Sequence, residues 1–264
     1  MMVEKVEREA RELFRPEAAV KAELTPRWIR VEFNREIIAD SRRAVLVREE
    51  GRTPSYYFPR EDVHFDFLRE SDKVTHEPNK GKTVHWDLRV GKRSVPNAAF
   101  AHPEPESDYP ELQDYVSFNW DDMDAWFEEE EQIFVHPRDP YKRVDIVPSS
   151  RHVRIELEGA VLAESHRPWL LFETWLPTRY YLPAEDVNME YLKRSDTHTS
   201  CPYKGNASHY SVVIDGEEYK DLVWTYFDPI DNAKRIKGLL AFYNEKLDVY
   251  IDEELQDRPN TPWS

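Results

Sequence analysis

The segment with the clearest chemical potential is 199–205, which reads Thr-Ser-Cys-Pro-Tyr-Lys-Gly. Its proline suits the second position of a type I turn that starts at Cys201, and Gly205 suits the left-handed residue that closes a bulged hairpin. Such a turn brings Cys201 close to Lys204, whose ammonium group favours the thiolate, the reactive form of cysteine. His209 follows on the next expected strand, where it can act as a base or orient a proton. The sequence therefore predicts Cys201 and His209 as catalytic residues, with a small buried cysteine in a structural hairpin as the alternative.

Aromatic side chains near the same hairpin indicate a small-ligand site. A pocket with aromatic walls and a lysine at its rim suits a small molecule. The alternative is that these residues fill the core of a sheet, because strands favour aromatic side chains. Glu185 either joins the site or caps a turn, and Arg154 either joins it or pairs with a neighbouring strand. The predicted ligand-binding residues are Tyr203, Lys204, Tyr180, Tyr181, Trp224, Tyr226, Glu185 and Arg154.

These residues belong to the second of two copies of one domain. The copies align without a gap, and a repeat of this length is too long for a solenoid. Each copy is therefore expected to be a complete domain with its own core. At the offset of 124 residues, Arg154 matches Arg30, Tyr181 matches Tyr57, Lys204 matches Lys80 and His209 matches His85.

The two copies differ at the segment that is richest in chemistry. The first copy reads Glu-Pro-Asn-Lys-Gly at 77–81, so it keeps the turn-forming residues but lacks the thiol and the phenol. Phe100 stands where the second copy has Trp224, and His102 stands where it has Tyr226. Any function of these side chains is therefore expected in the second copy, with the first as a divergent scaffold.

Each copy is predicted to be mainly β. Apolar and polar residues alternate over 29–33 and 153–157, as in a half-buried strand. Short strands separated by Pro, Asp and Asn favour antiparallel sheets over βαβ units. Helical spacing of apolar residues predicts one helix near the end of each copy, over 112–123 and 236–247. The expected organisation is an N-terminal helical extension at 1–26, a first repeat at 27–127, an ordered proline-containing connector at 128–150, a second repeat at 151–251 and a tail at 252–264.

Charge and composition argue against several classes of partner. The formal charge of −16 repels nucleic acid and anionic membranes, so neither is expected to bind. The sequence lacks an apolar stretch long enough to span a membrane and an apolar signal-peptide core, which favours a cytoplasmic protein. The single cysteine argues against an internal disulfide and against a zinc site built from several cysteines. No metal site is predicted, the composition identifies no cofactor, and a protein partner stays open.

Four segments of the second copy together resemble the DUF427 family, here as a tandem protein: Arg179–Val187, Ser195–Ala207, Trp224–Tyr226 and Ala241–Tyr243. The resemblance implies a compact β-rich fold similar to the β-tent group, which includes Mss4-like proteins. The family is functionally uncharacterised, although a nucleotidyltransferase label is attached to it. Scattered single glycines and the absence of a Gly-rich phosphate loop give that label no support from these residues.

Three functions follow from these patterns, in decreasing order of preference. The first is binding of a small molecule in an aromatic-lined pocket of the second repeat, with or without catalysis. The second is a non-enzymatic interaction or scaffold protein, in which the distinctive segments only shape turns. The third is nucleotidyl transfer.

Overall fold

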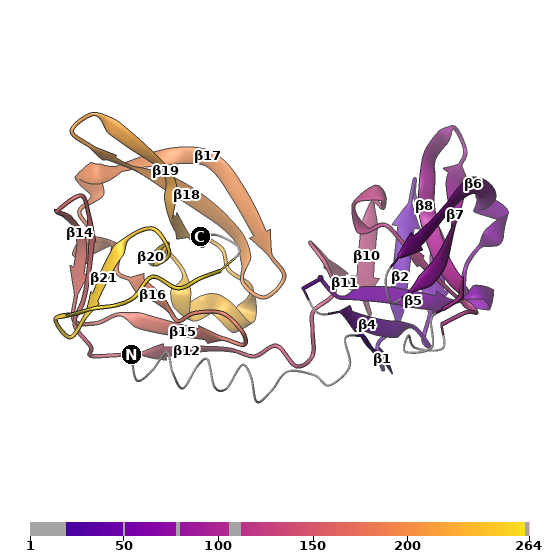
Figure 1. Cartoon of the computed structure of the whole chain (residues 1–264), viewed down its shortest axis with the longest axis horizontal. Coiled ribbons are helices and arrows are strands. Elements are labelled where there is room, and N and C mark those ends of the chain that lie inside the picture. The colour runs from indigo at the N-terminus through magenta and orange to yellow at the C-terminus, as the bar shows by residue number, and fades with distance from the viewer. Residues whose placement is uncertain (1–19, 50, 78–79, 106–111, 262–263) are drawn as a thin grey trace. The chain divides into compact units, whose positions relative to one another are not determined.

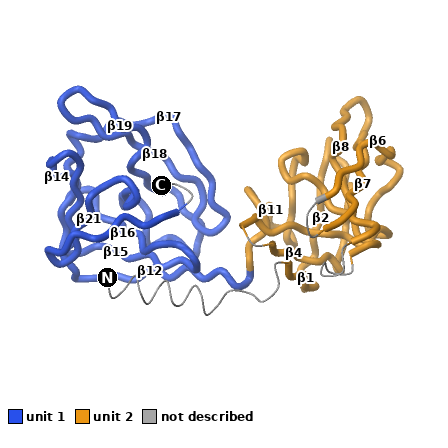
Figure 2. Tube along the Cα trace, in the orientation of Figure 1, with its two compact units in different colours: residues 1–15, 140–264 blue, residues 16–139 orange. Residues whose placement is uncertain are grey.

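The computed structural model describes residues 20–49, 51–77, 80–105, 112–261 and 264. The described residues form two compact units, and the chain passes from one to the other between Asp139 and Pro140. In chain order, the first unit is drawn in orange in Figure 2 and the second in blue.

The first unit consists, in its described residues, of two antiparallel sheets (Figure 1). A seven-stranded sheet has the order β1-β4-β5-β9-β8-β7-β6, and a four-stranded sheet has the order β11-β10-β2-β3. The strands are β1 Val20–Leu24, β2 Ile29–Phe33, β3 Glu36–Ser41, β4 Val45–Glu49, β5 Ser55–Pro59, β6 Leu68–Glu77, β7 Gly81–Val90, β8 Arg93–Glu104, β9 Tyr115–Phe118, β10 Ala125–Glu128 and β11 Glu131–Ile133.

The second unit repeats this arrangement strand for strand. Its seven-stranded sheet has the order β12-β15-β16-β20-β19-β18-β17, and its four-stranded sheet has the order β14-β13-β21-β22. The strands are β12 Val144–Pro148, β13 Val153–Leu157, β14 Ala160–Ser165, β15 Trp169–Glu173, β16 Arg179–Leu182, β17 Leu192–Cys201, β18 Gly205–Ile214, β19 Glu217–Thr225, β20 Leu240–Phe242, β21 Asp248–Ile251 and β22 Glu254–Leu255. Short 3₁₀ helices link strands at Arg60–Asp62, Phe65–Phe67, Trp120–Asp122, Ala184–Asp186, Met189–Tyr191 and Asp231–Ile236.

The prediction of two mainly β, antiparallel domains is confirmed, but the helix predicted near the end of each copy is wrong. Residues 112–123 contain β9 and a 3₁₀ helix, and residues 236–247 contain β20. In β20, Leu240 and Phe242 face one apolar cluster while Ala241 faces another. A strand buried on both faces gives a continuous apolar run, which helical spacing also matches. No helix in the described part of the chain is long and apolar enough to cross a membrane.

Strands also occupy segments expected to lie outside the repeats. Residues 20–24 of the expected helical extension form β1, which pairs with β4. Residues 144–148 of the expected connector form β12, which pairs with β15 in the same way. The helical pattern over 3–14 falls outside the described residues. Residues 131–133 of the connector and 254–255 of the expected tail likewise form the edge strands β11 and β22. Each domain therefore includes two more edge strands than the repeat seen in the sequence.

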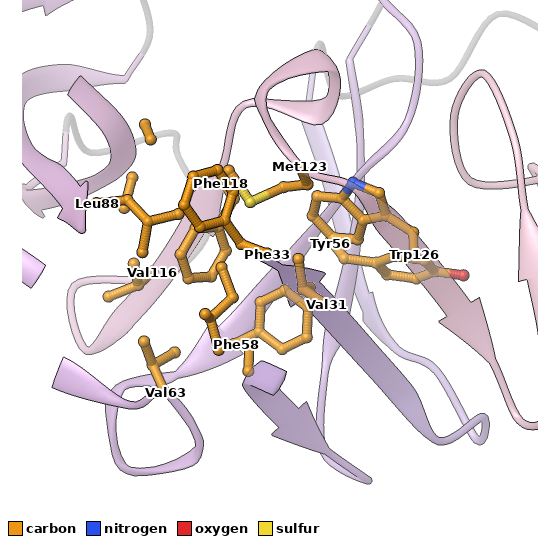
Figure 3. Close-up of a cluster of buried hydrophobic side chains, with 14 of the residues drawn as sticks. Val31, Phe33, Tyr56, Phe58, Val63, Leu88, Val116, Phe118, Met123 and Trp126 are labelled. Carbon is orange, nitrogen blue, oxygen red and sulfur yellow. The ribbon is translucent and has the colours of Figure 1, made fainter. Parts of the chain in front are cut away.

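The main core of each unit lies between its two sheets. In the first unit, Val31 and Phe33 of the smaller sheet pack with Phe58 and Phe118 of the larger one (Figure 3). In the second unit, the corresponding cluster again combines residues of both sheets, among them Ile155 and Val223. A separate apolar cluster covers the other face of the second seven-stranded sheet. That second cluster includes three of the predicted site residues, Tyr181, Trp224 and Tyr226.

Candidate functional site

The β17–β18 hairpin ends in the turn that the sequence predicts. Cys201 pairs with Gly205 across the turn, and the backbone N–H of Lys204 donates to the Cys201 carbonyl oxygen at 3.3 Å. Gly205 has a φ of +101°, and a Cβ there would lie 3.3 Å from the backbone nitrogen of Ile230. Glycine is therefore favoured at this position by both backbone conformation and space.

A buried group of charges holds this turn against β15. The Lys204 ammonium contacts one carboxylate oxygen of Glu173, and the Lys142 ammonium contacts the other at 2.8 Å. The Glu173 side chain is only 4% exposed. Burial alone would raise the pKa of Glu173, but the two ammonium groups outweigh it and hold that pKa below its usual value. Glu173 is therefore ionised at neutral pH.

This ion pair requires the seven-stranded sheet to curl. Three strands separate β15 from β18 in the sheet order, so a flat sheet would place the two strands about 19 Å apart. Lysine and glutamate side chains cannot span that gap, and the hairpin tip instead comes round to the end of β15 (Figure 1). We call the face inside this curl the concave face; its buried apolar residues are Ile146, Leu171, Tyr181, Ala207, Trp224, Tyr226, Ala233, Ile236 and Ala241.

A row of cross-strand partners brings several predicted residues together on the concave face. Residues directly opposite each other on paired strands share a face. The row runs across the sheet from Trp169 through Tyr181, Ala241 and Trp224 to His209. Tyr180, next to Tyr181 in β16, points to the opposite face and packs on the cluster between the sheets. The structure therefore separates Tyr180 from the other aromatic residues.

Two tyrosine hydroxyls lie near the charged group on this face. The Trp224 indole N–H donates to the Tyr181 hydroxyl at 3.1 Å. Burial raises the pKa of Tyr181 and of Tyr226, and the Glu173 carboxylate raises both pKa values further, while the Trp224 N–H and the Arg179 guanidinium partly oppose the rise at Tyr181. Both phenols are thus neutral at physiological pH, and Cys201 lies within electrostatic range of both.

Tyr203 lies in the turn itself, beside Lys142. The Lys142 ammonium is 5.2 Å from the centroid of the Tyr203 ring, a distance typical of cation–π contact. Lys142 was not among the predicted site residues, because it precedes the segment recognised as the second repeat. The signal that could have found it is the comparison of the copies, since the first copy has alanine at the matching position 18.

A second buried ion pair, which sequence reasoning missed, adjoins the aromatic row. The Arg179 guanidinium donates to both carboxylate oxygens of Glu245, at 2.6 and 2.7 Å. It also lies 5.5 Å from the ring centroid of Trp224. Burial would raise the pKa of Glu245, but the bonds from Arg179 and from Thr261 hold that pKa below its usual value. The first copy has Ser55 and Asp121 at the matching positions, so this pair belongs to the second copy alone.

His209 lies at the far end of the aromatic row. Its Nε2 is 2.9 Å from the Thr199 hydroxyl, and its side chain is buried. Burial lowers the pKa of His209, while the nearby Asp221 carboxylate partly opposes that effect. Sequence reasoning named His209 but missed Thr199 and Asp221. The first copy keeps the His–Thr contact, with His85 Nε2 at 3.3 Å from the Thr75 hydroxyl.

Two predicted ligand residues lie elsewhere. Glu185 pairs with Arg167 at 2.9 Å, beside Asp186, which accepts a hydrogen bond from Ser165 at 2.7 Å. Arg154 lies in the smaller sheet, where it pairs with Glu156 on its own strand at 2.9 Å. Neither contact involves the concave face. Arg154 thus forms its shortest charge pair along its own strand and not across strands, and Glu185, in the short 3₁₀ helix Ala184–Asp186, forms an ion pair.

Within the residues that the structure describes, no group of three or more His, Cys, Asp or Glu side chains is arranged to hold a metal ion. The predicted residues that the structure does bring to the concave face or its hairpin are Cys201, Tyr203, Lys204, His209, Tyr181, Trp224 and Tyr226.

Comparison with protein families matches both halves of the chain to one model. The model, described as a domain of unknown function (DUF427), matches residues 21–129 and 145–253. The two matches begin within β1 and β12, in agreement with the additional edge strand at the start of each unit. No curated protein matches the chain.

The Arg179→Met variant is expected to lose about 3–5 kcal/mol in the free energy of unfolding, because it leaves the buried Glu245 carboxylate uncompensated. Urea unfolding of the full chain, followed by tryptophan fluorescence, measures the loss. Arg167→Met is the matched control; solvent screens its exposed pair with Asp186, so its loss should be much smaller. The double variant Arg179→Met/Glu245→Leu should recover most of the loss. Equal losses in Arg179→Met and the control would contradict this reading.

The free energy of unfolding should decrease as the pH is lowered, because His209 takes up a proton more readily in the unfolded chain than in the folded one. Burial holds the folded-state pKa of His209 below its ordinary value of 6.5, so this contribution to stability is intact above that pH. It is lost progressively as the pH falls from there through the folded-state pKa. His209→Gln should therefore show a shallower decline in melting temperature between neutral and mildly acidic pH than wild type. Exposed His64→Gln is the control, and parallel wild-type and His209→Gln curves would rule the effect out.

Proposed function

We propose, for a chain that belongs to the DUF427 family in both halves, that the second repeat binds a small molecule at the concave face and its hairpin. The observation that carries this proposal is the location of seven residues whose side-chain chemistry differs between the two copies. They lie at one face of one sheet and at its hairpin. The residues are Lys142, Arg179, Cys201, Tyr203, Trp224, Tyr226 and Glu245, which replace Ala18, Ser55, Glu77, Asn79, Phe100, His102 and Asp121 of the first copy.

The residues shared by the copies have a structural role in this account. In the first unit, the Lys80 ammonium lies 2.7 Å from a Glu49 carboxylate oxygen, which reproduces the pair between Lys204 and Glu173. The same hairpin is thus closed against the same strand in both units. A pair needed by both domains supports the fold first, and we assign Lys204 mainly to that role.

The residues particular to the second copy supply what a ligand needs. Trp224 and Tyr243 offer aromatic surface 4.7 Å apart between ring centroids, and Arg179 lies over both. The neutral hydroxyls of Tyr181 and Tyr226 can donate or accept hydrogen bonds. Apolar walls with a few convergent polar groups are typical of small-molecule sites. Cys201 and His209 adjoin this surface, and the proposal assigns them to binding without a covalent step.

A protein-binding role is the second candidate, and exposed apolar side chains favour it. Val147, Phe172 and Trp175 are each at least 40% exposed in the β12–β15 part of the second unit. Phe172 points away from the concave face, because it neighbours Glu173 in β15. This surface is therefore separate from the proposed ligand site, and variants can test the two independently.

The test is a thermal-shift screen of the full chain against metabolites and nucleotides, with and without Mg²⁺ and Zn²⁺. A ligand at 100 times its dissociation constant adds about 2.7 kcal/mol to the free energy of unfolding. Tyr203→Asn, which installs the residue of the first copy, should lose this stabilisation. Phe172→Asn also replaces an aromatic side chain with asparagine, but on the opposite face of β15, so this variant should keep the ligand-induced stabilisation.

Two outcomes would overturn the proposal. One is that no compound stabilises the wild-type protein. The other is that Tyr203→Asn responds to its ligand as wild type does while Phe172→Asn does not, which would transfer the binding surface to the exposed side of β15.

A further inference from the structure

We infer that the ligand of the second repeat is a small organic anion, and that its charged group binds at the Lys142 ammonium beside the Tyr203 ring. The inference rests on the proposed function and adds the chemical class of the ligand. Three observations support it: the charge balance around Glu173, the exposure of the two lysines, and the comparison with the first copy.

Among the described residues, two ammonium groups contact one carboxylate here, which gives this three-residue group an excess of one positive charge. Glu173 is a single carboxylate, and the charges that act on it are the ammonium groups of Lys204 and Lys142. Each lysine occupies a different carboxylate oxygen. An ammonium group has three donors, and the contact of Lys142 with Glu173 uses one of them. The group is thus equipped to bind a further acceptor that brings negative charge.

Exposure distinguishes the two lysines. The Lys204 side chain is 11% exposed and is enclosed by the hairpin that it closes. The Lys142 side chain is 25% exposed, so it reaches solvent while staying partly desolvated. Partial burial strengthens an ionic contact relative to one in bulk water, because the local dielectric constant is lower. Lys142 is therefore the cation that an incoming anion can meet.

The first copy retains the structural pair but lacks both residues of the anion site. It keeps Lys80 with Glu49, and it has Ala18 and Asn79 at the positions of Lys142 and Tyr203. A second cation, Arg52, does approach Glu49, at 3.7 Å, but its side chain is 59% exposed and solvent screens its charge. The second copy thus has a partly buried cation and an aromatic ring together, and the first copy has neither residue at the matching positions.

The whole-chain charge limits the size of the anion's charge. The formal charge of −16 creates a negative electrostatic potential around the protein, which repels polyanions. A small anion carries less charge, and a single nearby ammonium group can bind it. The ring of Tyr203 next to that ammonium favours an anion with a planar or apolar body. A carboxylate and a phosphate monoester share this chemistry, and the experiment distinguishes them.

The experiment is fluorine-observed NMR titration of the full chain with 4-fluorobenzoate, 4-fluorophenyl phosphate and the neutral 4-fluorobenzamide. At least one anion should bind with a dissociation constant of about 1 mM or tighter, and the amide at least about tenfold more weakly. Lys142→Ala should weaken anion binding by about tenfold or more. Lys142→Arg, which keeps the charge, should retain the preference for the anion. Lys193→Ala, at an exposed lysine paired with Glu218, is the matched control and should bind as wild type does.

Equal binding of the amide and the anions to wild type would overturn this inference while leaving small-molecule binding in place. Unchanged anion binding by Lys142→Ala would also overturn it, and so would the failure of both anions to bind wild type. The proposal that the second repeat binds a small molecule fails on a different result, namely that no compound in the thermal-shift screen stabilises the wild-type protein.

Discussion

A buried lysine–glutamate pair determines the shape of both domains. Glu173 ends β15, and Lys204 lies in the turn just before β18. Three strands separate β15 from β18 in the seven-stranded sheet, so the two side chains meet only because the sheet curls. Lys80 and Glu49 impose the same closure on the first domain. The smaller sheet covers one face of the larger sheet, and the curl buries the other face. The placement of Tyr181, Trp224 and Tyr226 beside the hairpin turn depends on this closure.

The duplication distinguishes contacts that both domains share from contacts that only the second domain has. The closing ion pair and the His–Thr contact occur in both domains, whereas Arg179 with Glu245 and Lys142 with Tyr203 occur only in the second. Buried charge is costly unless it is paired, so an added buried ion pair is weak support for stability alone. The additions adjoin one another around Trp224 and the hairpin turn. Concentration of new polar chemistry at one place is what a binding site requires.

The sequence predicted the parts of the fold that depend on local patterns. Alternation over 29–33 and 153–157 identified strands, and the constant offset between copies identified two domains. The spacing of Pro202 and Gly205 identified a turn, because the positive φ of Gly205 is a backbone conformation that the residue type itself favours. The helices expected near 112–123 and 236–247 are strands and 3₁₀ helices, because burial on both faces removes the alternation that distinguishes a strand.

The candidate site could be predicted only in part, because its partners are distant in the sequence. Cys201, Tyr203 and Lys204 were found from one short segment, but Glu173 lies 31 residues from Lys204 and Glu245 lies 66 residues from Arg179. Nothing local connects such pairs, since they meet through sheet order and curl. Comparison of the copies was the available signal, and it marks Arg179 as clearly as it marks the hairpin.

The central claim, that the ion pair closes the curled sheet, is tested most directly by amide hydrogen exchange in Lys204→Met. The account predicts faster exchange over residues 199–206 and at the end of β15, with unchanged exchange in β13 and β14 of the smaller sheet. Wild-type protection throughout the hairpin in a variant without the ammonium group would show that other contacts close the sheet, and would contradict the account.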